Sequence, residues 1–406
     1  MLYYILYFLL LLSSLLIFWQ FLGYPLFMAI YSSFSKSEEK DYNFKPFISI
    51  IVPAYNEENV IKRRIENLID LKYPKDKYEI IIVESRSEDE TFKVAAALAK
   101  KYDNVKVLRE EERKGKASAI NFGRRYAKAD IILVTDANDI FDKNVLKEIA
   151  PHFKNPKVGS VGGRFVLSNV ENDLIRSSSF YWDLESLMRK GESNFDSACL
   201  FHGEINAWRK DIVKADENAV TEDLDMAINI RKKGFKNVYE PNAIVYECGP
   251  TSTGEQITQK KRTTIGTIQS FFTHKKYLWL PKDRYSGFIF PSHKTLQIFS
   301  PFLLITMLVS LSFLFALQKF NFLIIFIITA GIAFLISSIL LNRKVSKIRV
   351  NNSVSHGNII RKFFNFIYYI FLHEFIILLA WKDFLFGRYS VLWKKVESTR
   401  TLEKAG

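Results

Sequence analysis

The stretch Ala129-Asp130-Ile131-Ile132-Leu133-Val134-Thr135-Asp136-Ala137-Asn138-Asp139 sets four apolar residues directly before a cluster of oxygen-bearing side chains. The apolar run predicts a buried strand, and polar groups that follow a strand lie at its carboxyl end, where open α/β sheets bind ligands. Asp136 and Asn138 offer the carboxylate and carbonyl oxygens that a hard divalent cation prefers. An ordinary turn is the alternative, because Asp and Asn also favour turns.

Short apolar runs alternate with amphipathic stretches on both sides of this segment, from residue 47 to about residue 280. The alternation predicts an α/β domain, a mainly parallel sheet covered by helices. The expected strands are 48–52, 79–83, 105–108, 131–134, 158–161, 164–167, 238–239 and 243–246. Neither glycine signature of a phosphate-binding loop occurs, Gly-x-Gly-x-x-Gly or Gly-x-x-x-x-Gly-Lys-Ser/Thr, which weighs against dinucleotide and P-loop sites.

Uncharged segments flank this region. Residues 1–34 contain no Asp, Glu, Lys or Arg and are long enough to span a bilayer. A cleavable signal peptide is the alternative, but a basic n-region is missing and the apolar run is too long. Residues 295–317 and 320–341 predict a transmembrane hairpin. The segment 363–381 carries His373 and Glu374 in its middle, which favours an interfacial or re-entrant helix over a simple span.

The distribution of charge orients these segments. Lys and Arg cluster beside the apolar runs and hold their flanks on the cytoplasmic side, so we expect a multi-pass protein of the cell membrane with a cytoplasmic central domain. The net charge is +14, and the segment after residue 341 holds 12 Lys and Arg against 4 Asp and Glu. Attraction to membrane lipids explains this excess better than nucleic-acid binding, which we do not expect. Two cysteines are too few for a disulfide framework.

A second acidic motif, Thr221-Glu222-Asp223, opens an expected helix that runs through Ile230. Helix capping by Thr221, with acids in the first turn, is one interpretation of it. The motifs together resemble the membrane-anchored family-2 glycosyltransferases, inverting enzymes with a GT-A fold, over residues 47–280. In that family the Asp of the Thr-Glu-Asp motif is the general base. The resemblance therefore implies Asp223 as base, with Glu222 as the second choice.

The same resemblance assigns the remaining site residues. It implies that Pro53, Ala54, Tyr55 and Glu57 hold the nucleotide, with Lys116 near it. Asp136 and Asn138 stand at the Asp-x-Asp position, so they are expected to bind Mg²⁺ or Mn²⁺, and Asp136 also contacts the donor diphosphate. Gln259 and Arg262 match the start of Gln-x-x-Arg-Trp and are assigned to the diphosphate and acceptor region. His202 is assigned to the acceptor side, with structural packing as the alternative.

Departures from the family pattern bear on these assignments. Glu84 follows the second strand, where it is expected to contact the base or ribose, and Arg86 replaces a usual glycine. Asn138 replaces the second Asp of the metal motif, which lowers the ligand charge and predicts weaker or more selective metal binding. Thr263 replaces the Trp of processive polysaccharide synthases, which weighs against processive synthesis.

The expected protein is a GT-A mixed-sheet domain flanked by transmembrane helices. The expected segments are an anchor at 1–34, a glycosyltransferase domain at 45–280, a transmembrane hairpin at 295–341, and an interfacial, re-entrant or transmembrane helix with a basic tail at 359–406. We expect it to move a sugar from a nucleotide-diphosphate sugar to a glycan or lipid-linked acceptor. A polyprenyl-phosphate glycosyltransferase and a non-catalytic subunit of a glycan export complex are the alternatives. The sequence leaves the oligomeric state open.

Overall fold

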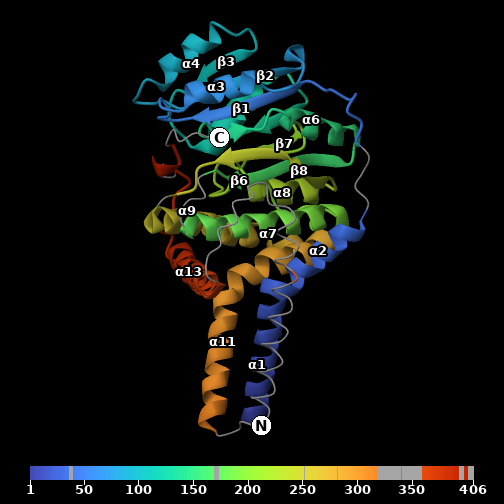
Figure 1. Cartoon of the computed structure of the whole chain (residues 1–406), viewed down its shortest axis with the longest axis vertical. Coiled ribbons are helices and arrows are strands. Elements are labelled where there is room, and N and C mark those ends of the chain that lie inside the picture. The colour runs from blue at the N-terminus through green and yellow to red at the C-terminus, as the bar shows by residue number, and fades with distance from the viewer. Residues whose placement is uncertain are drawn as a thin grey trace.

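The computed structural model describes residues 1–35, 40–168, 173–250, 252–280, 282–317, 340, 359–392 and 397–400. Side chains are described for all of these except residues 173–180, 359–370 and 397. The described chain has two parts. A sheet with its covering helices forms the upper part, and two long apolar helices project below it as a stalk (Figure 1).

One mixed sheet organises the upper part, with strands β1 (Ile48–Ala54), β2 (Tyr78–Glu84), β3 (Val105–Arg109), β4 (Ile131–Val134), β5 (Ile140–Phe141), β6 (Val158–Leu167), β7 (Asn206–Arg209) and β8 (Lys236–Glu247). Their order is β3-β2-β1-β4-β7-β6-β8-β5. The half around β1 is parallel, since β1 pairs in that sense with β2 and β4, and β2 with β3. Strand β7 runs antiparallel to β4 and β6, β5 runs antiparallel to β8, and β6 and β8 are parallel. The α/β mixed sheet expected from the sequence is confirmed.

Four predicted strands, β1 to β4, occur where the sequence placed them, but the second half differs. The expected strands 158–161 and 164–167 are one continuous strand, β6, as are 238–239 and 243–246 in β8. Glycines account for the false break in β6. A Cβ on Gly162 would lie 2.9 Å from the Phe201 ring, and one on Gly163 would meet the carbonyl oxygen of Ala243. These glycines interrupt the apolar pattern because neighbouring groups occupy the space of a side chain.

Helices cover both faces of the sheet: α3 (Ile61–Ile69), α4 (Thr91–Ala99), α5 (Lys116–Tyr126), α6 (Val145–Ile149), α7 (Asp173–Phe195), α8 (Glu222–Lys232), α9 (Thr253–Thr273) and the short α10 (Lys275–Leu278). Successive side chains of β1 enter opposite cores, Ile50 packing with α3 residues and Ile51 with α5 residues. Gly123 brings α5 close to the sheet, since a Cβ there would lie 2.9 Å from methyl groups of Ile51 and Val83. The parallel half is therefore a rigid base for the loops that follow β1, β2 and β4.

The stalk consists of α1 (Leu2–Phe18) and α11 (Leu296–Ala316), which lie side by side (Figure 1). In the described part of the chain, Leu2–Phe34 and Tyr285–Ala316 are the two helical segments long and apolar enough to cross a membrane. Of the most apolar window in each segment, 22% and 28% of the residues are buried, so most are not packed in a core. The expected span 1–34 coincides with the first segment, and 295–317 overlaps the second except for residue 317. The other expected arm, 320–341, lies almost wholly outside the described residues.

Two connections tie the stalk to the sheet domain. Helix α2 (Tyr24–Phe34), which continues from α1 through η1 (Trp19–Gly23), packs on α7, where Gly191 lies against the backbone of Met28. Helix α13 (Ile359–Leu385) lies at the base of the sheet domain near α9 rather than along the stalk (Figure 1). Trp381 of α13 donates its indole N–H to the carbonyl of Ile298, at 2.7 Å. The chain then returns to the sheet, where η6 (Glu397–Arg400) lies.

Candidate active site

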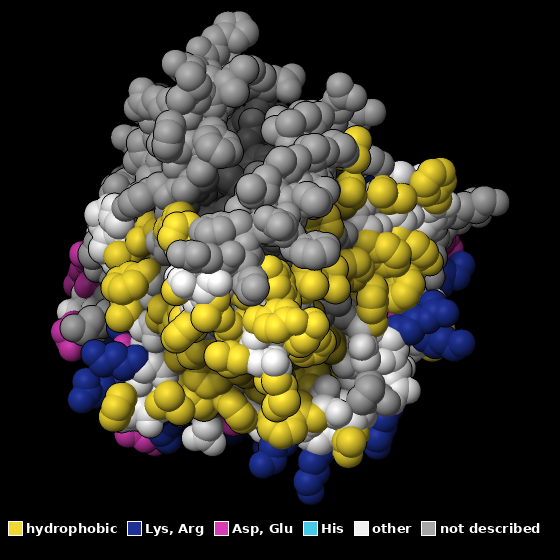
Figure 2. All heavy atoms as spheres, turned by 90° about the horizontal axis from the view of Figure 1, so that it is seen from below, with side chains coloured by type: hydrophobic (Ala, Val, Ile, Leu, Met, Phe, Trp, Pro, Cys, Tyr) yellow, Lys and Arg dark blue, Asp and Glu magenta, His cyan; other side chains and the backbone are white. Residues whose placement is uncertain are grey.

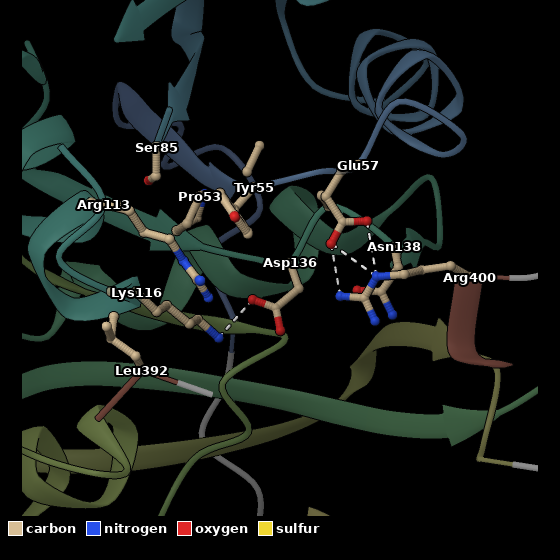
Figure 3. A pocket seen from close by; sticks show the side chains of 14 residues that line it. Pro53, Tyr55, Glu57, Ser85, Arg113, Lys116, Asp136, Asn138, Leu392 and Arg400 are labelled. Carbon is tan, nitrogen blue, oxygen red and sulfur yellow. Dashed lines mark hydrogen bonds and ion pairs between the residues drawn. The ribbon is translucent and has the colours of Figure 1, made fainter. Parts of the chain in front are cut away.

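A pocket opens at the carboxyl ends of β1, β2 and β4 (Figure 3). Its walls come from the loops after these strands, from the start of α5, and from the returning C-terminal segment. The lining residues are Pro53, Ala54, Tyr55, Glu57, Ser85, Arg113, Gly115, Lys116, Ala119, Asp136, Ala137, Asn138, Leu392 and Arg400. Seven residues assigned from the sequence are among them: Pro53, Ala54, Tyr55, Glu57, Lys116, Asp136 and Asn138.

The buried side chain of Asp139 holds the loop that carries Asp136. Asp139 accepts hydrogen bonds through Oδ2 from the backbone N–H of Asp136, at 2.9 Å, and from the hydroxyl of Thr135, at 3.1 Å. The guanidinium of Arg64, fully buried on α3, donates to the same hydroxyl and stacks over Phe141 at 4.2 Å from the ring centre. These contacts fix the backbone at the strand end, so the Asp136 carboxylate projects into the pocket from a rigid support.

Lys116 joins the two acidic motifs. Its ammonium lies 2.6 Å from Oδ1 of Asp136 and 3.4 Å from Oε1 of Glu222. Burial lowers the pKa of Lys116, but the carboxylates of Asp136 and Glu222 outweigh it, so the pKa lies above its ordinary value. Gly115 precedes it with φ of 106°, a conformation that favours glycine, and α5 begins at Lys116. The positive end of this helix therefore faces the pocket together with a lysine, an arrangement suited to an anion.

Tyr55 forms part of the pocket wall together with Arg113, whose guanidinium carbon lies 3.8 Å from the centre of the tyrosine ring. Asn56 follows with φ of 55°, and its side-chain oxygen accepts from the N–H of Glu88 at 2.9 Å. This bond ties the loop after β1 to the loop after β2. The flat ring beside a cation gives this end of the pocket a face on which a planar ring can stack.

The second acidic motif begins α8. Thr221 makes no side-chain capping bond there, so the simple capping interpretation is not realised in the described structure. Asp223 is half-buried in the first helical turn, which suits a negative charge. Burial, followed by the charge of Glu222, raises the pKa of Asp223 to about 6. On α9, Arg262 donates to the carbonyl of Val220 at 3.0 Å, which places its guanidinium beside the same motif.

Six assigned residues are not among those that line the pocket. Glu222, Asp223 and Arg262 belong to the second acidic motif and its surroundings, and the other three are Glu84, His202 and Gln259. Glu84 is fully buried at the end of β2, where it pairs with Arg109 at 2.9 Å, and Ser85 faces the pocket instead. His202 is buried and stacks on Phe165, with ring centres 5.2 Å apart. Gln259 lies on the exposed face of α9. The packing of His202 corresponds to the structural alternative weighed above.

The arrangement of Asp136 and Asn138 fits a divalent cation. One carboxylate and one amide side by side at the pocket wall form a partial shell of hard oxygen ligands, and Asp136 already binds the ammonium of Lys116. No group of three or more His, Cys, Asp or Glu side chains could hold a metal within the described ranges. A partial shell of this kind is typical of Mg²⁺ sites that substrate phosphates complete.

Other contributors to the site were not assigned from the sequence. Arg400 and Leu392 reach the pocket from the end of the described chain, more than 250 residues after Asn138 along the sequence. Glu204 lies among the carboxylates of the site, where burial, followed by the charge of Asp136, raises its pKa to about 7. The burial of Arg64 was predictable from the sequence, because Arg64 falls on the apolar face of its helix with Ile61, Ile65 and Leu68. No local pattern marks Arg400.

Residues 49–214, which contain β1 to β7 and the metal motif, match the model of the family described as glycosyl transferase family 2. The chain carries a family-2 glycosyltransferase domain. Three examples of the curated proteins to which the chain is similar follow. A probable glycosyltransferase, YdaM, of Bacillus subtilis is 29% identical over 275 residues, which cover 62% of this chain and 64% of that protein. A beta-monoglucosyldiacylglycerol synthase of Trichormus variabilis is 29% identical over 238 residues, covering 56% and 50%. A poly-beta-1,6-N-acetyl-D-glucosamine synthase of Staphylococcus aureus is 27% identical over 280 residues, covering 63% and 67%.

The matched stretch thus spans between half and about two thirds of the length of these curated relatives. Among solved structures, a mannosyltransferase from Pyrobaculum calidifontis in complex with GDP-Man and Mn²⁺ superposes with a TM-score of 0.69. It is 20% identical, and the match covers 94% of this chain and all of that one. The likeness shows that the family-2 domain has the GT-A fold that the sequence predicted.

Proposed function

We propose that the protein is an inverting glycosyltransferase that moves a sugar from a nucleotide-diphosphate sugar to the hydroxyl of a glycan or lipid-linked acceptor at a membrane. The observation that carries this proposal is the position of Lys116. Its ammonium contacts Asp136 of the metal motif and Glu222 of the second acidic motif, so the two motifs meet at one point. In a transfer reaction the acceptor oxygen attacks the same carbon that the diphosphate leaves, so the base of the acceptor and the groups that hold the diphosphate must lie close together.

The donor nucleotide fits the pocket after β1. The Tyr55 ring and the Arg113 guanidinium offer a stacking face for the base, and Ser85 offers a hydroxyl. The diphosphate would lie toward Lys116, where the ammonium and the first N–H groups of α5 present positive charge. Charge-assisted hydrogen bonds from Lys116 would then hold the phosphate oxygens.

Asp136 and Asn138 would hold Mg²⁺ or Mn²⁺ between the protein and the diphosphate. When bound, the cation neutralises negative charge that develops on the leaving diphosphate. Lys116 contributes to the same electrostatic stabilisation from the protein side. The GDP-Man and Mn²⁺ in the neighbouring mannosyltransferase structure support this assignment, as does the partial oxygen shell described above.

Asp223 would act as the general base. The acceptor's hydroxyl oxygen attacks the anomeric carbon, and its proton passes to Oδ1 or Oδ2 of Asp223. A pKa of about 6 leaves the carboxylate mostly ionised at neutral pH and close to the pH range in which a base is most effective. Attack from the face opposite the leaving diphosphate inverts the anomeric centre and needs one base only.

A membrane location explains the lower surface of the protein. Hydrophobic side chains gather over the underside, and Lys and Arg lie toward its margins (Figure 2). Exposed large apolar residues occur on both stalk helices and on α13, among them Phe8, Leu15, Phe313, Phe371 and Phe375. Such a surface with basic margins suits a bilayer with anionic headgroups. We therefore propose that both stalk helices cross the membrane, with the sheet domain on the cytoplasmic side.

The relatives support an acceptor at the membrane, since one is named for a glycolipid product and another for a polysaccharide. A polyprenyl-phosphate acceptor is the alternative within this chemistry. A phosphate is already ionised and needs no general base. A hydroxyl acceptor therefore requires Asp223 as the base, and a phosphate acceptor does not. A non-catalytic subunit would need neither the base nor the lysine that links the two motifs.

Asp223→Asn tests the choice between these acceptors. The variant keeps the shape of the side chain and removes its basicity. We expect nucleotide binding, measured by calorimetry on the purified protein in detergent, to stay within about threefold of the wild type, and turnover to fall by about 10²- to 10⁴-fold. Near-normal turnover would overturn the base assignment and favour a phosphate acceptor. The exposed α3 variant Glu66→Gln serves as the matched control.

A further inference from the structure

Asn138, the weaker of the two expected metal ligands, is held by a carboxylate from the far half of the sheet. Its side-chain nitrogen Nδ2 donates to Oε1 of Glu247 at 2.7 Å. Asn138 is 5% exposed, and Glu247 is the last residue of β8. The strand end is itself fixed, because the backbone carbonyl of Glu247 accepts from the N–H of Ser168 at 3.0 Å.

This contact decides which way the Asn138 amide points. The amide nitrogen is the only donor of the Asn138 side chain, and it is the end that faces the accepting oxygen of Glu247. The carbonyl oxygen Oδ1 therefore points away from Glu247. Without a fixed acceptor, the terminal torsion of an asparagine is broad and its two ends can exchange. Only the amide oxygen can bind a cation, so an amide without a fixed partner would spend part of its time with its nitrogen toward the cation site.

The pair also bears on charge. Asn138 carries no charge, whereas the Asp it replaces would, and its amide nitrogen is held by a carboxyl oxygen of Glu247. Outer groups that hydrogen-bond a metal ligand both orient it and increase its affinity for the metal. Because Glu247 faces the nitrogen of the amide, it polarises the amide and increases the negative charge on the carbonyl oxygen.

We propose that Glu247 is a positioning residue that fixes the Asn138 amide with its carbonyl oxygen toward the divalent cation. The assignment rests on the proposed function, in which Asp136 and Asn138 bind that cation. It accounts for the loss of the second Asp from the metal motif. The asparagine can serve as a ligand because Glu247, at the end of β8, holds its amide nitrogen and so keeps the amide in one of its two orientations.

A double-mutant cycle on metal affinity tests the assignment. Mn²⁺ binding to the full chain in detergent, in the presence of a nucleoside diphosphate, is measured by the electron paramagnetic resonance of free Mn²⁺. Glu247→Ala should weaken Mn²⁺ binding by about 10-fold. In the Asn138→Asp background the same change should alter affinity by less than about threefold, because a carboxylate has two equivalent oxygens and no wrong orientation.

Equal losses in the two backgrounds would overturn the assignment, since a purely structural role, or direct ligation by Glu247, acts regardless of the residue at position 138. An unchanged affinity in Glu247→Ala would overturn it as well. Thermal unfolding verifies that each variant is folded. If Glu247→Ala does not fold, Glu247→Gln replaces it in the same cycle, with a smaller expected loss of about threefold in the Asn138 background.

The two proposals fail in different ways. If the wild type does not bind Mn²⁺ at all, the metal-dependent function fails, and the positioning role fails with it. If the wild type binds Mn²⁺ and the cycle shows no coupling, the positioning role alone is wrong. Glu66→Gln, an exposed carboxylate on α3, controls for a general effect of net charge and should bind Mn²⁺ as the wild type does.

Discussion

Arg400, close to the end of the chain, forms a two-pronged ion pair with Glu57, which follows the first strand of the sheet. Nη2 lies 2.7 Å from Oε1, and Nε lies 2.9 Å and 3.0 Å from the two carboxylate oxygens. Both side chains are largely buried and both line the pocket (Figure 3). The segment after α13 thus completes the wall of the site that begins with β1.

The Arg400–Glu57 pair makes a prediction about donor affinity. Arg400→Ala leaves the Glu57 carboxylate buried without its partner and releases the C-terminal segment from the pocket. Hydrogen bonds to charged groups contribute about 1.5–3 kcal/mol, so we expect the KM for the donor to rise by about 10-fold or more. Arg400→Lys should recover only part of the loss, because an ammonium cannot form the bidentate contact. A donor KM that stays the same in Arg400→Ala would contradict this account of the pocket.

The raised pKa of Asp223 predicts the pH dependence of activity. Burial and Glu222 raise this pKa to about 6, while the backbone N–H of Leu224 and the cations of Lys116 and Arg262 oppose the shift. A general base must be ionised, so kcat/KM should be constant above the pKa and fall as the pH drops through about 6. Glu222→Gln removes one raising charge and should move this acid limb to lower pH. If Glu222→Gln instead abolishes turnover at every pH, Glu222 is the base.

The contact between α2 and α7 predicts how the stalk is attached to the sheet domain. A methyl group on Gly191 would meet the backbone carbonyl of Met28 and lie 2.7 Å from its Cβ. Gly191→Ala should therefore push the helices apart and lower the free energy of unfolding by about 1–3 kcal/mol. Thermal unfolding in detergent measures the effect. Gly254→Ala is the matched control, because nothing lies within 4 Å of its added Cβ and it sits in helix α9. Equal stability of the two variants would contradict a tight α2–α7 contact.

The parallel half of the sheet was predictable because each of its strands has a recognisable local sequence pattern. The run from Ile131 to Val134 is apolar, short and followed by acids, and it forms β4 with Asp136 at its carboxyl end. Strands β5 and β7 were missed. They have two and four residues, too few for a periodic pattern, and form only because β8 and β4 offer them a partner.

The backbone also explains one departure from the family. Arg86, which stands where the family has glycine, adopts a φ of 56°, in the left-handed region that glycine favours. Its side chain donates through Nε to the carbonyl of Glu111 at 2.7 Å. The turn therefore has the left-handed conformation that glycine favours, and a hydrogen bond holds the larger residue in it.

Several residues at the pocket wall were not predictable from local sequence. Glu84 was expected at the nucleotide because of its position after β2, but side chains alternate along a strand, and Glu84 points into the sheet toward Arg109 while Ser85 faces the pocket. Arg400 and Glu247 could not be assigned, since each meets its partner, Glu57 or Asn138, only once the sheet and the C-terminal segment have folded together. Contacts between residues so far apart in the sequence leave no local sequence pattern.

The central claim is that Asp136 serves metal-dependent transfer from a nucleotide sugar. The most direct measurement is the release of nucleoside diphosphate by the purified full chain, with GDP and UDP sugars as donors and Mn²⁺ present. We predict release from at least one donor, loss of that release with EDTA, and a decrease of at least about 100-fold in Asp136→Ala. The contradictory result is release that persists unchanged in EDTA or in Asp136→Ala, or no release from any nucleotide sugar by the folded protein.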